Sequence, residues 1–221
     1  MNKHLTDVEA RRRFIRSASA FALTFAALPP ALACQRDGAA KTSAAAPDAP
    51  RPSRVDIADR REPGTRLFMS GTVYGADGKP APGVKLFLYH TDAEGFYSRP
   101  VSDPRRSRLR GAVWSDAQGR YAFDTVRPGH YAGVSQPPPL HIHVHLEPPR
   151  LPDHWVDSFY FEGDEHLQSA IVERARGLER FSNVITLKPG GAGVLQGVRD
   201  FRIDPALAER NRVADGWYRN E

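Results

Sequence analysis

From residue 66 onward, the chain alternates short apolar runs with polar segments that contain turn residues. Asp77-Gly78 and Asp116 to Gly119 are typical turn sequences, because glycine readily adopts positive φ. Runs of this length at this spacing favour a β-sandwich. We expect strands over residues 67–74, 84–89, 112–114, 121–126, 141–146, 155–161, 184–187 and 197–203.

One helix interrupts this pattern. Leu167, Ile171, Val172 and Ala175 have helical spacing, which predicts a helix over residues 164–176. Residues 205–220 have weaker periodicity and at most a short helix is expected there. The sequence therefore predicts an all-β sandwich with one short helix over residues 66–205, followed by a C-terminal extension over 206–221.

The first 33 residues have the pattern of a signal peptide. Arg11-Arg12-Arg13-Phe14-Ile15-Arg16 precedes an uncharged stretch over 17–33 that ends in small residues. The arginine pair resembles a twin-arginine export signal, and Ala31-Leu32-Ala33-Cys34 resembles a lipoprotein-processing site. These resemblances imply an exported periplasmic or cell-envelope lipoprotein, anchored through Cys34. Ordinary cleavage nearby and a transmembrane helix are the alternatives, although Pro29-Pro30 and the short apolar length count against a helix.

Residues 34–65 join the signal to the sandwich. They are rich in Ala, Pro, Ser, Asp and Arg and contain almost no large apolar side chains. Such a segment cannot bury enough surface to offset the entropy of ordering. We therefore expect a flexible linker.

Composition narrows the classes of function. The 221 residues, 40% of them hydrophobic, are enough for about one domain. The net charge is +5, but residues 1–33 carry five basic and two acidic side chains, so the remainder has only +2. This counts against a nucleic-acid partner, because such proteins need a basic surface. The single cysteine cannot form an intramolecular disulfide or a multi-thiolate zinc site.

Candidate chemistry is concentrated in His141-Ile142-His143-Val144-His145. Alternate residues of a strand point to the same face, so the three imidazoles share one side. Imidazole is a common metal ligand, and neighbouring members of such a row can bind one ion. The spacing alone does not distinguish zinc, copper, iron and manganese. In a zinc hydrolase, His145 would serve as the third ligand.

Further motifs make the sequence similar to the intradiol ring-cleaving dioxygenases, which include the protocatechuate 3,4- and catechol 1,2-cleaving enzymes. The resemblance runs from about Leu67 to Ile203, and its segments keep the order of that family. They are Gly71-Thr72-Val73 with Asp77-Gly78-Lys79-Pro80, Leu86 to His90 with Gly95-Phe96-Tyr97, Arg127-Pro128-Gly129-His130-Tyr131, Pro139-Leu140-His141-Ile142-His143, and Tyr160-Phe161-Glu162-Gly163-Asp164.

The resemblance implies a non-haem Fe(III) centre with Tyr97, Tyr131, His141 and His143 as ligands, and it leaves His145 outside this set. Two phenolates neutralise much of the charge of a hard trication, which fits that ligand set. In this family the second tyrosine, here Tyr131, leaves the metal when substrate binds. The implied partners are O2 and an aromatic diol, cleaved between its hydroxylated carbons to a muconate-type product.

The sequence departs from the family pattern at two positions. Pro138 stands where family members have an arginine that stabilises charge on the ring, and Ser158 stands where they have a glutamine. Neither position is a metal ligand, so we expect metal binding to survive and the rate or substrate choice to change. Arg99, Arg108 and Arg110 are candidates to supply the missing charge, although loop arginines are usually solvated.

Three classes of function follow from the sequence. The first is an exported intradiol dioxygenase, for which Tyr97 and Tyr131 are the candidate catalytic residues. The second is a metal enzyme of another type, such as a zinc hydrolase using the same ligands. The third is an envelope lipoprotein that binds a metal or ligand without catalysis.

Overall fold

The computed structural model describes residues 51–99 and 103–214. The predicted signal peptide and Cys34 lie outside these residues. Among the described residues, no helix is long and apolar enough to cross a membrane.

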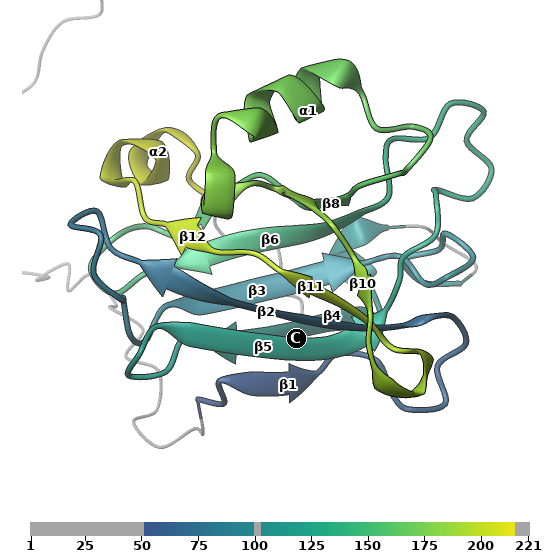
Figure 1. Ribbon diagram of the computed structural model, residues 1–221, viewed down its shortest axis with the longest axis horizontal. Coiled ribbons are helices and arrows are strands. Elements are labelled where there is room, and N and C mark those ends of the chain that lie inside the picture. Colours follow the sequence, from purple (N-terminus) through teal and green to yellow (C-terminus); the bar gives the residue numbers. More distant parts are fainter. Residues whose placement is uncertain (1–50, 100–102, 215–221) are drawn as a thin grey trace, which may run out of the picture. The chain divides into compact units, whose positions relative to one another are not determined.

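The described chain forms two β-sheets (Figure 1). The first sheet has the order β1-β5-β2-β11-β10, with β12 also paired to β2, and the second has the order β4-β3-β6-β8-β9, with β7 also paired to β6. The first comprises β1 (Arg54–Asp56), β5 (Arg120–Val126), β2 (Arg66–Tyr74), β11 (Leu195–Val198), β10 (Lys188–Pro189) and β12 (Phe201–Arg202). The second comprises β4 (Leu109–Trp114), β3 (Lys85–His90), β6 (His141–Glu147), β8 (Phe159–Phe161), β9 (Val184–Ile185) and β7 (His154–Trp155). These sheets confirm the predicted sandwich.

A single apolar core lies between the sheets. Met69 of β2 and Phe123 of β5 come from the first sheet, and Leu86 of β3 and Val144 of β6 from the second, and all four are completely buried. Side chains alternate between the two faces of a strand, so the face that carries these apolar residues points inward. The core thus fixes which residues of each strand face away from it.

The sandwich begins earlier than the boundary predicted at residue 66. Strand β1 lies within the segment predicted as a flexible linker and pairs in parallel with β5. Ile57 and Ala58, which follow β1, belong to the buried core. A three-residue strand is too short to produce a detectable apolar pattern, which explains the error.

Two predicted strands are each divided into two. Residues 155–161 contain β7 and β8, and residues 197–203 contain the end of β11 and all of β12. The predicted helix over 164–176 is shorter, because α1 spans Ser169–Arg176. The residues before it form a loop around the carboxylate of Asp164, whose Oδ1 accepts the backbone N–H of His166.

The segment predicted as a C-terminal extension is part of the fold as far as residue 214. Helix α2 (Pro205–Arg210) begins after Asp204, whose side chain caps the helix by accepting from the backbone N–H of Ala206. Ala208 of this helix is completely buried. Asn211 then accepts the backbone N–H of Trp155 in β7. The extension therefore packs beside the strand that follows the histidine run.

Candidate metal centre

Strand β6 presents its histidines on the face opposite the core. Ile142, Val144 and Leu146 are completely buried between the sheets. Because side chains alternate along a strand, the three histidines of β6 point to the other side. Other side chains and loops cover that side, so His141 is only 9% exposed and His145 only 1%.

Two of these loops carry the candidate tyrosines. Tyr97 follows β3 and Tyr131 follows β5, and their loops meet through glycines. Gly95 has φ +89°, and a Cβ there would lie 1.8 Å from the carbonyl oxygen of His130. A Cβ at Gly129 would lie 2.5 Å from the backbone of the opposite loop. Only residues without a side chain permit this approach, which brings the tyrosines together.

Four donor atoms converge beside β6: Tyr97 Oη, Tyr131 Oη, His141 Nε2 and His143 Nε2, here called the four-donor cluster. Tyr97 Oη lies 2.5 Å from Tyr131 Oη and 3.0 Å from His143 Nε2. Tyr131 Oη lies 2.9 Å from His141 Nε2 and 3.4 Å from His143 Nε2. The two imidazole nitrogens are 3.0 Å apart. The structure therefore brings together all four residues that the sequence predicts as ligands.

His145 occupies a different environment. Its ring contacts Trp155, with centroids 3.6 Å apart, and lies 5.9 Å from both Phe87 and Tyr89. Burial lowers the pKa of His145 to about 3. Among the described residues, the three histidines of β6 do not form a group whose ligand atoms lie close enough together to hold one metal ion. This geometry counts against a zinc site with His145 as the third ligand.

The electrostatics keep the four-donor cluster neutral. Burial lowers the pKa of His143 to about 2, reinforced by His141, His145 and His90, and burial also lowers the pKa of His141. Burial raises the pKa of both tyrosines above the ordinary phenol value. Neutral imidazoles are the form that binds metals, whereas the phenols would ionise only when a cation displaces their protons.

Neighbouring groups hold the two imidazoles in place. His141 Nδ1 donates to the carbonyl of Pro139 at 2.6 Å, which directs Nε2 into the four-donor cluster. The ring of His143 stacks on Tyr89 at 4.5 Å, and its Nδ1 lies 3.4 Å from the Ser158 hydroxyl. Such contacts usually fix the orientation of a ligating histidine. Ser158 thus touches a predicted ligand.

Sequence reasoning did not identify Asp164, which connects the two segments that carry Tyr131 and His141. Its side chain is completely buried, Oδ1 accepts from His130 Nε2 at 2.9 Å, and Oδ2 accepts from the backbone N–H of Leu140 at 2.5 Å. Burial alone would raise the pKa of Asp164, but the hydrogen bonds from the His166 backbone, His130 and the Leu140 backbone outweigh burial and lower it. The available signal was an acidic residue directly after Gly163, a few residues beyond the buried strand β8.

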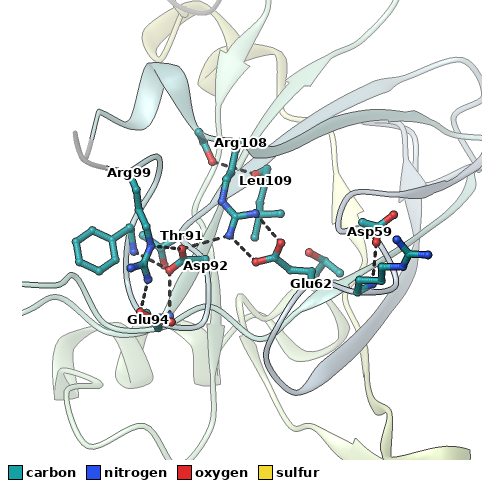
Figure 2. Close-up of polar contacts among 12 residues, drawn as sticks. Asp59, Glu62, Thr91, Asp92, Glu94, Arg99, Arg108 and Leu109 are labelled. Atoms are coloured by element: carbon teal, nitrogen blue, oxygen red, sulfur yellow. Dashed lines mark hydrogen bonds and ion pairs between the residues drawn. The ribbon is translucent and has the colours of Figure 1, made fainter.

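Two candidate arginines belong to a carboxylate network (Figure 2). Both terminal nitrogens of Arg108 lie 2.5 Å from the carboxylate of Glu62, and one also lies 3.3 Å from Asp92. Arg99 pairs with Glu94 and lies 3.7 Å from Asp92. Carboxylates engage both guanidinium groups, which counts against either arginine as a substitute for the one that Pro138 replaces.

Arg110 lies on β4, in register with Tyr89 of β3. This register does not test whether Arg110 supplies the missing charge, so that hypothesis stays a prediction.

Comparison with known proteins finds similarity to dioxygenases. A protein-family model described as "Dioxygenase" matches residues 38–187. Catechol 1,2-dioxygenase from Acinetobacter baylyi is 34% identical over 91 residues, which are 40% of this chain and 29% of that enzyme. The chain thus spans less than a third of that relative's length.

Solved structures share the fold. The dioxygenase domain of a dioxygenase carbohydrate-binding protein fusion from Streptomyces sp. SirexAA-E has a TM-score of 0.53 and 26% identity, covering 72% of this chain and 91% of that one. Catechol 1,2-dioxygenase from Pseudomonas arvilla C-1 has a TM-score of 0.54 and 22% identity, covering 76% of this chain and 64% of that one.

Proposed function

The chain belongs to the intradiol ring-cleavage dioxygenase family, and from this premise we propose that it is a non-haem Fe(III) dioxygenase. It would insert O2 between the hydroxylated carbons of a catechol-type aromatic and give a muconate-type product. The observation that carries the proposal is the four-donor cluster, in which each tyrosine oxygen lies within 3.0 Å of a histidine Nε2.

The residues present fit a ferric ion. Two phenol oxygens and two imidazole nitrogens converge on one point. The hydrogen bond from His141 Nδ1 to the Pro139 carbonyl directs Nε2 toward that point. Phenolate is a hard, anionic ligand that suits a hard trication better than it suits zinc or copper(I). A bound ferric ion would take both oxygens of a catechol and withdraw electron density from the ring, which makes the ring reactive toward O2.

The two tyrosines differ in a way that suggests separate roles. Both tyrosines lie on loops, but Tyr97 is only 3% exposed, whereas Tyr131 is half-buried. Tyr131 therefore has more room to turn away when a substrate enters. We assign Tyr131 Oη, which would be a phenolate while it binds the ion, as the group that leaves and accepts a proton from one substrate hydroxyl, and Tyr97 as the ligand that stays in place.

The substrate proposal follows from Pro138 and from the carboxylate network. Arg99 and Arg108 are neutralised by Glu94, Glu62 and Asp92. Because these two guanidinium groups are held by carboxylates, we expect more of the reactivity of the ring to come from the substrate itself. Electron-donating substituents supply that reactivity, so we propose electron-rich catechols as the preferred substrates.

A visible spectrum of the iron-loaded chain tests the proposed centre. Tyrosinate bound to ferric iron gives a red-brown colour, whereas zinc gives none. His141→Gln and His143→Gln should lose iron and colour, because each removes a direct ligand, and Tyr97→Phe should shift the band. The matched control is His145→Gln, which should keep most of both. Equal loss in His145→Gln would indicate a three-histidine site and contradict the proposal.

A further inference from the structure

A second group of potential ligands lies where the Tyr131 loop meets the loop before α1, through His130 and Asp164. We propose that His130, Glu165 and His166 form a second metal site, which takes a divalent transition-metal ion of the zinc class. One ligand atom from each residue lies within 4.8 Å of the other two. The two histidine rings meet edge to face, with centroids 4.6 Å apart and an interplanar angle of 88°.

The buried carboxylate of Asp164 prepares this site. Oδ1 of Asp164 accepts from His130 Nε2 at 2.9 Å and from the backbone N–H of His166 at 3.0 Å. Histidines that bind metals commonly donate their other ring N–H to a carboxylate, which fixes the tautomer and strengthens the ligand. With Nε2 donating to Asp164, Nδ1 is the nitrogen of His130 that keeps a free lone pair. One buried side chain thus orients one ligand and the backbone of another.

The donor set indicates the class of metal. Two imidazoles and one carboxylate form a common zinc set, and the absence of phenolate makes the group a poorer match for ferric iron. Zinc–ligand bonds of about 2.0–2.2 Å require ligand atoms roughly 3.5 Å apart, so the group must contract by about 1 Å. The side chain of Glu165 is 81% exposed and can make this movement freely.

A fourth coordination position would face solvent. His130 and Glu165 line a pocket of about 580 Å³, together with Arg127 and Asp164. Three protein ligands and one open position form the usual arrangement of a zinc site that binds water or an anion. The ion would also link the loop before α1 to the loop that carries Tyr131. Binding at the second site is therefore expected to restrict the movement of Tyr131.

Zinc titration of the iron-loaded full chain tests this proposal. The iron is loaded first, so that the four-donor cluster is occupied. Calorimetry and elemental analysis after gel filtration should then show one additional zinc per chain. His166→Gln and Glu165→Gln should each weaken that binding at least tenfold and leave the visible spectrum unchanged. Glu165 is exposed and His166 is only half-buried, so the variants should fold.

Two controls separate this site from the iron centre. Glu162→Gln removes a nearby carboxylate that bonds the Thr186 hydroxyl, and it should bind zinc as the wild type does. His141→Gln should lose iron but keep the zinc whose binding depends on His166, so failure of the iron proposal would not affect this result. The second site is disproved if no additional zinc binds, or if it binds equally well to His166→Gln and Glu165→Gln.

Discussion

Pro138 stands at the position where the family resemblance implies an arginine. Replacing an arginine removes a fixed charge that acts only as charge develops on the ring, which commonly costs about a hundredfold in turnover, or roughly 3 kcal/mol of barrier. We expect Pro138→Arg to raise turnover of unsubstituted catechol far more than turnover of electron-rich catechols. Oxygen uptake across a substituted series measures this difference. Fast cleavage of catechol by the wild type, unchanged by the arginine, would show that another residue supplies the charge.

Asp164 is the residue that we expect to position ligands without touching the metal. Asp164→Asn keeps the size and shape of the side chain. An amide has only one acceptor oxygen, so it cannot accept from both His130 and the backbone N–H of Leu140 as the carboxylate does. Loss of such a supporting partner typically weakens metal binding 10–100-fold. Iron affinity and the position of the visible band should both change. The matched control is Asp157→Asn, at an exposed ion pair with Arg174, and an equal effect there would contradict the assignment.

The loops before Tyr97 and Tyr131 determine whether the four-donor cluster forms. Gly95→Ala would place Cβ 1.8 Å from the His130 carbonyl, so the loops must separate. Gly133 has a similar φ of +77° but nothing within 4 Å of its Cβ position. We therefore expect Gly95→Ala to lose iron binding and thermal stability, and Gly133→Ala to show only the smaller cost of strain. Iron content and melting temperature check this, and similar losses in both variants would contradict the steric explanation.

The strands of the sandwich were more predictable than the connections between them. The long strands β2, β3, β5 and β6 follow directly from alternation, which also placed the β6 histidines on one face. Strand β1 and the division between β7 and β8 were missed because two or three residues give no periodic signal. Alternation also cannot distinguish His145 from His141 and His143, because their difference depends on the aromatic side chains packed around each ring.

The candidate site depends on contacts distant in sequence. Tyr97 and Tyr131 were identified only by family resemblance, since no local pattern brings residue 97 next to residue 143. The role of Asp164 was not predictable for the same reason, because its hydrogen-bond partners His130 and Leu140 are 34 and 24 residues away. Local sequence predicts strands and faces, whereas the packing of loops assembles the four-donor cluster.

The four-donor cluster forms only when distant segments have folded together, so iron can bind only to the folded chain. This is relevant to how the chain is exported. We propose that the chain is exported by the twin-arginine route, which carries folded proteins and would allow iron to bind before transport. This proposal rests on Arg11, Arg12 and the residues after them, together with a lipid anchor at Cys34. Replacing both arginines by lysine should retain the chain in the cytoplasm. Fractionation and intact-mass analysis check this, and normal export of the variant or a mature chain that begins elsewhere than Cys34 would contradict it.

Cleavage of an electron-rich catechol under labelled O2 tests the central proposal most directly. The full chain, carrying one iron, is incubated with a methoxy-substituted catechol and ¹⁸O2, and the product is analysed by mass spectrometry. We predict a ring-opened muconate-type diacid that contains both labelled atoms, one in each new carboxyl group. The absence of oxygen uptake and ring-opened product with every diol tested, despite a bound iron, would contradict the proposed dioxygenase and favour a metal-binding envelope protein.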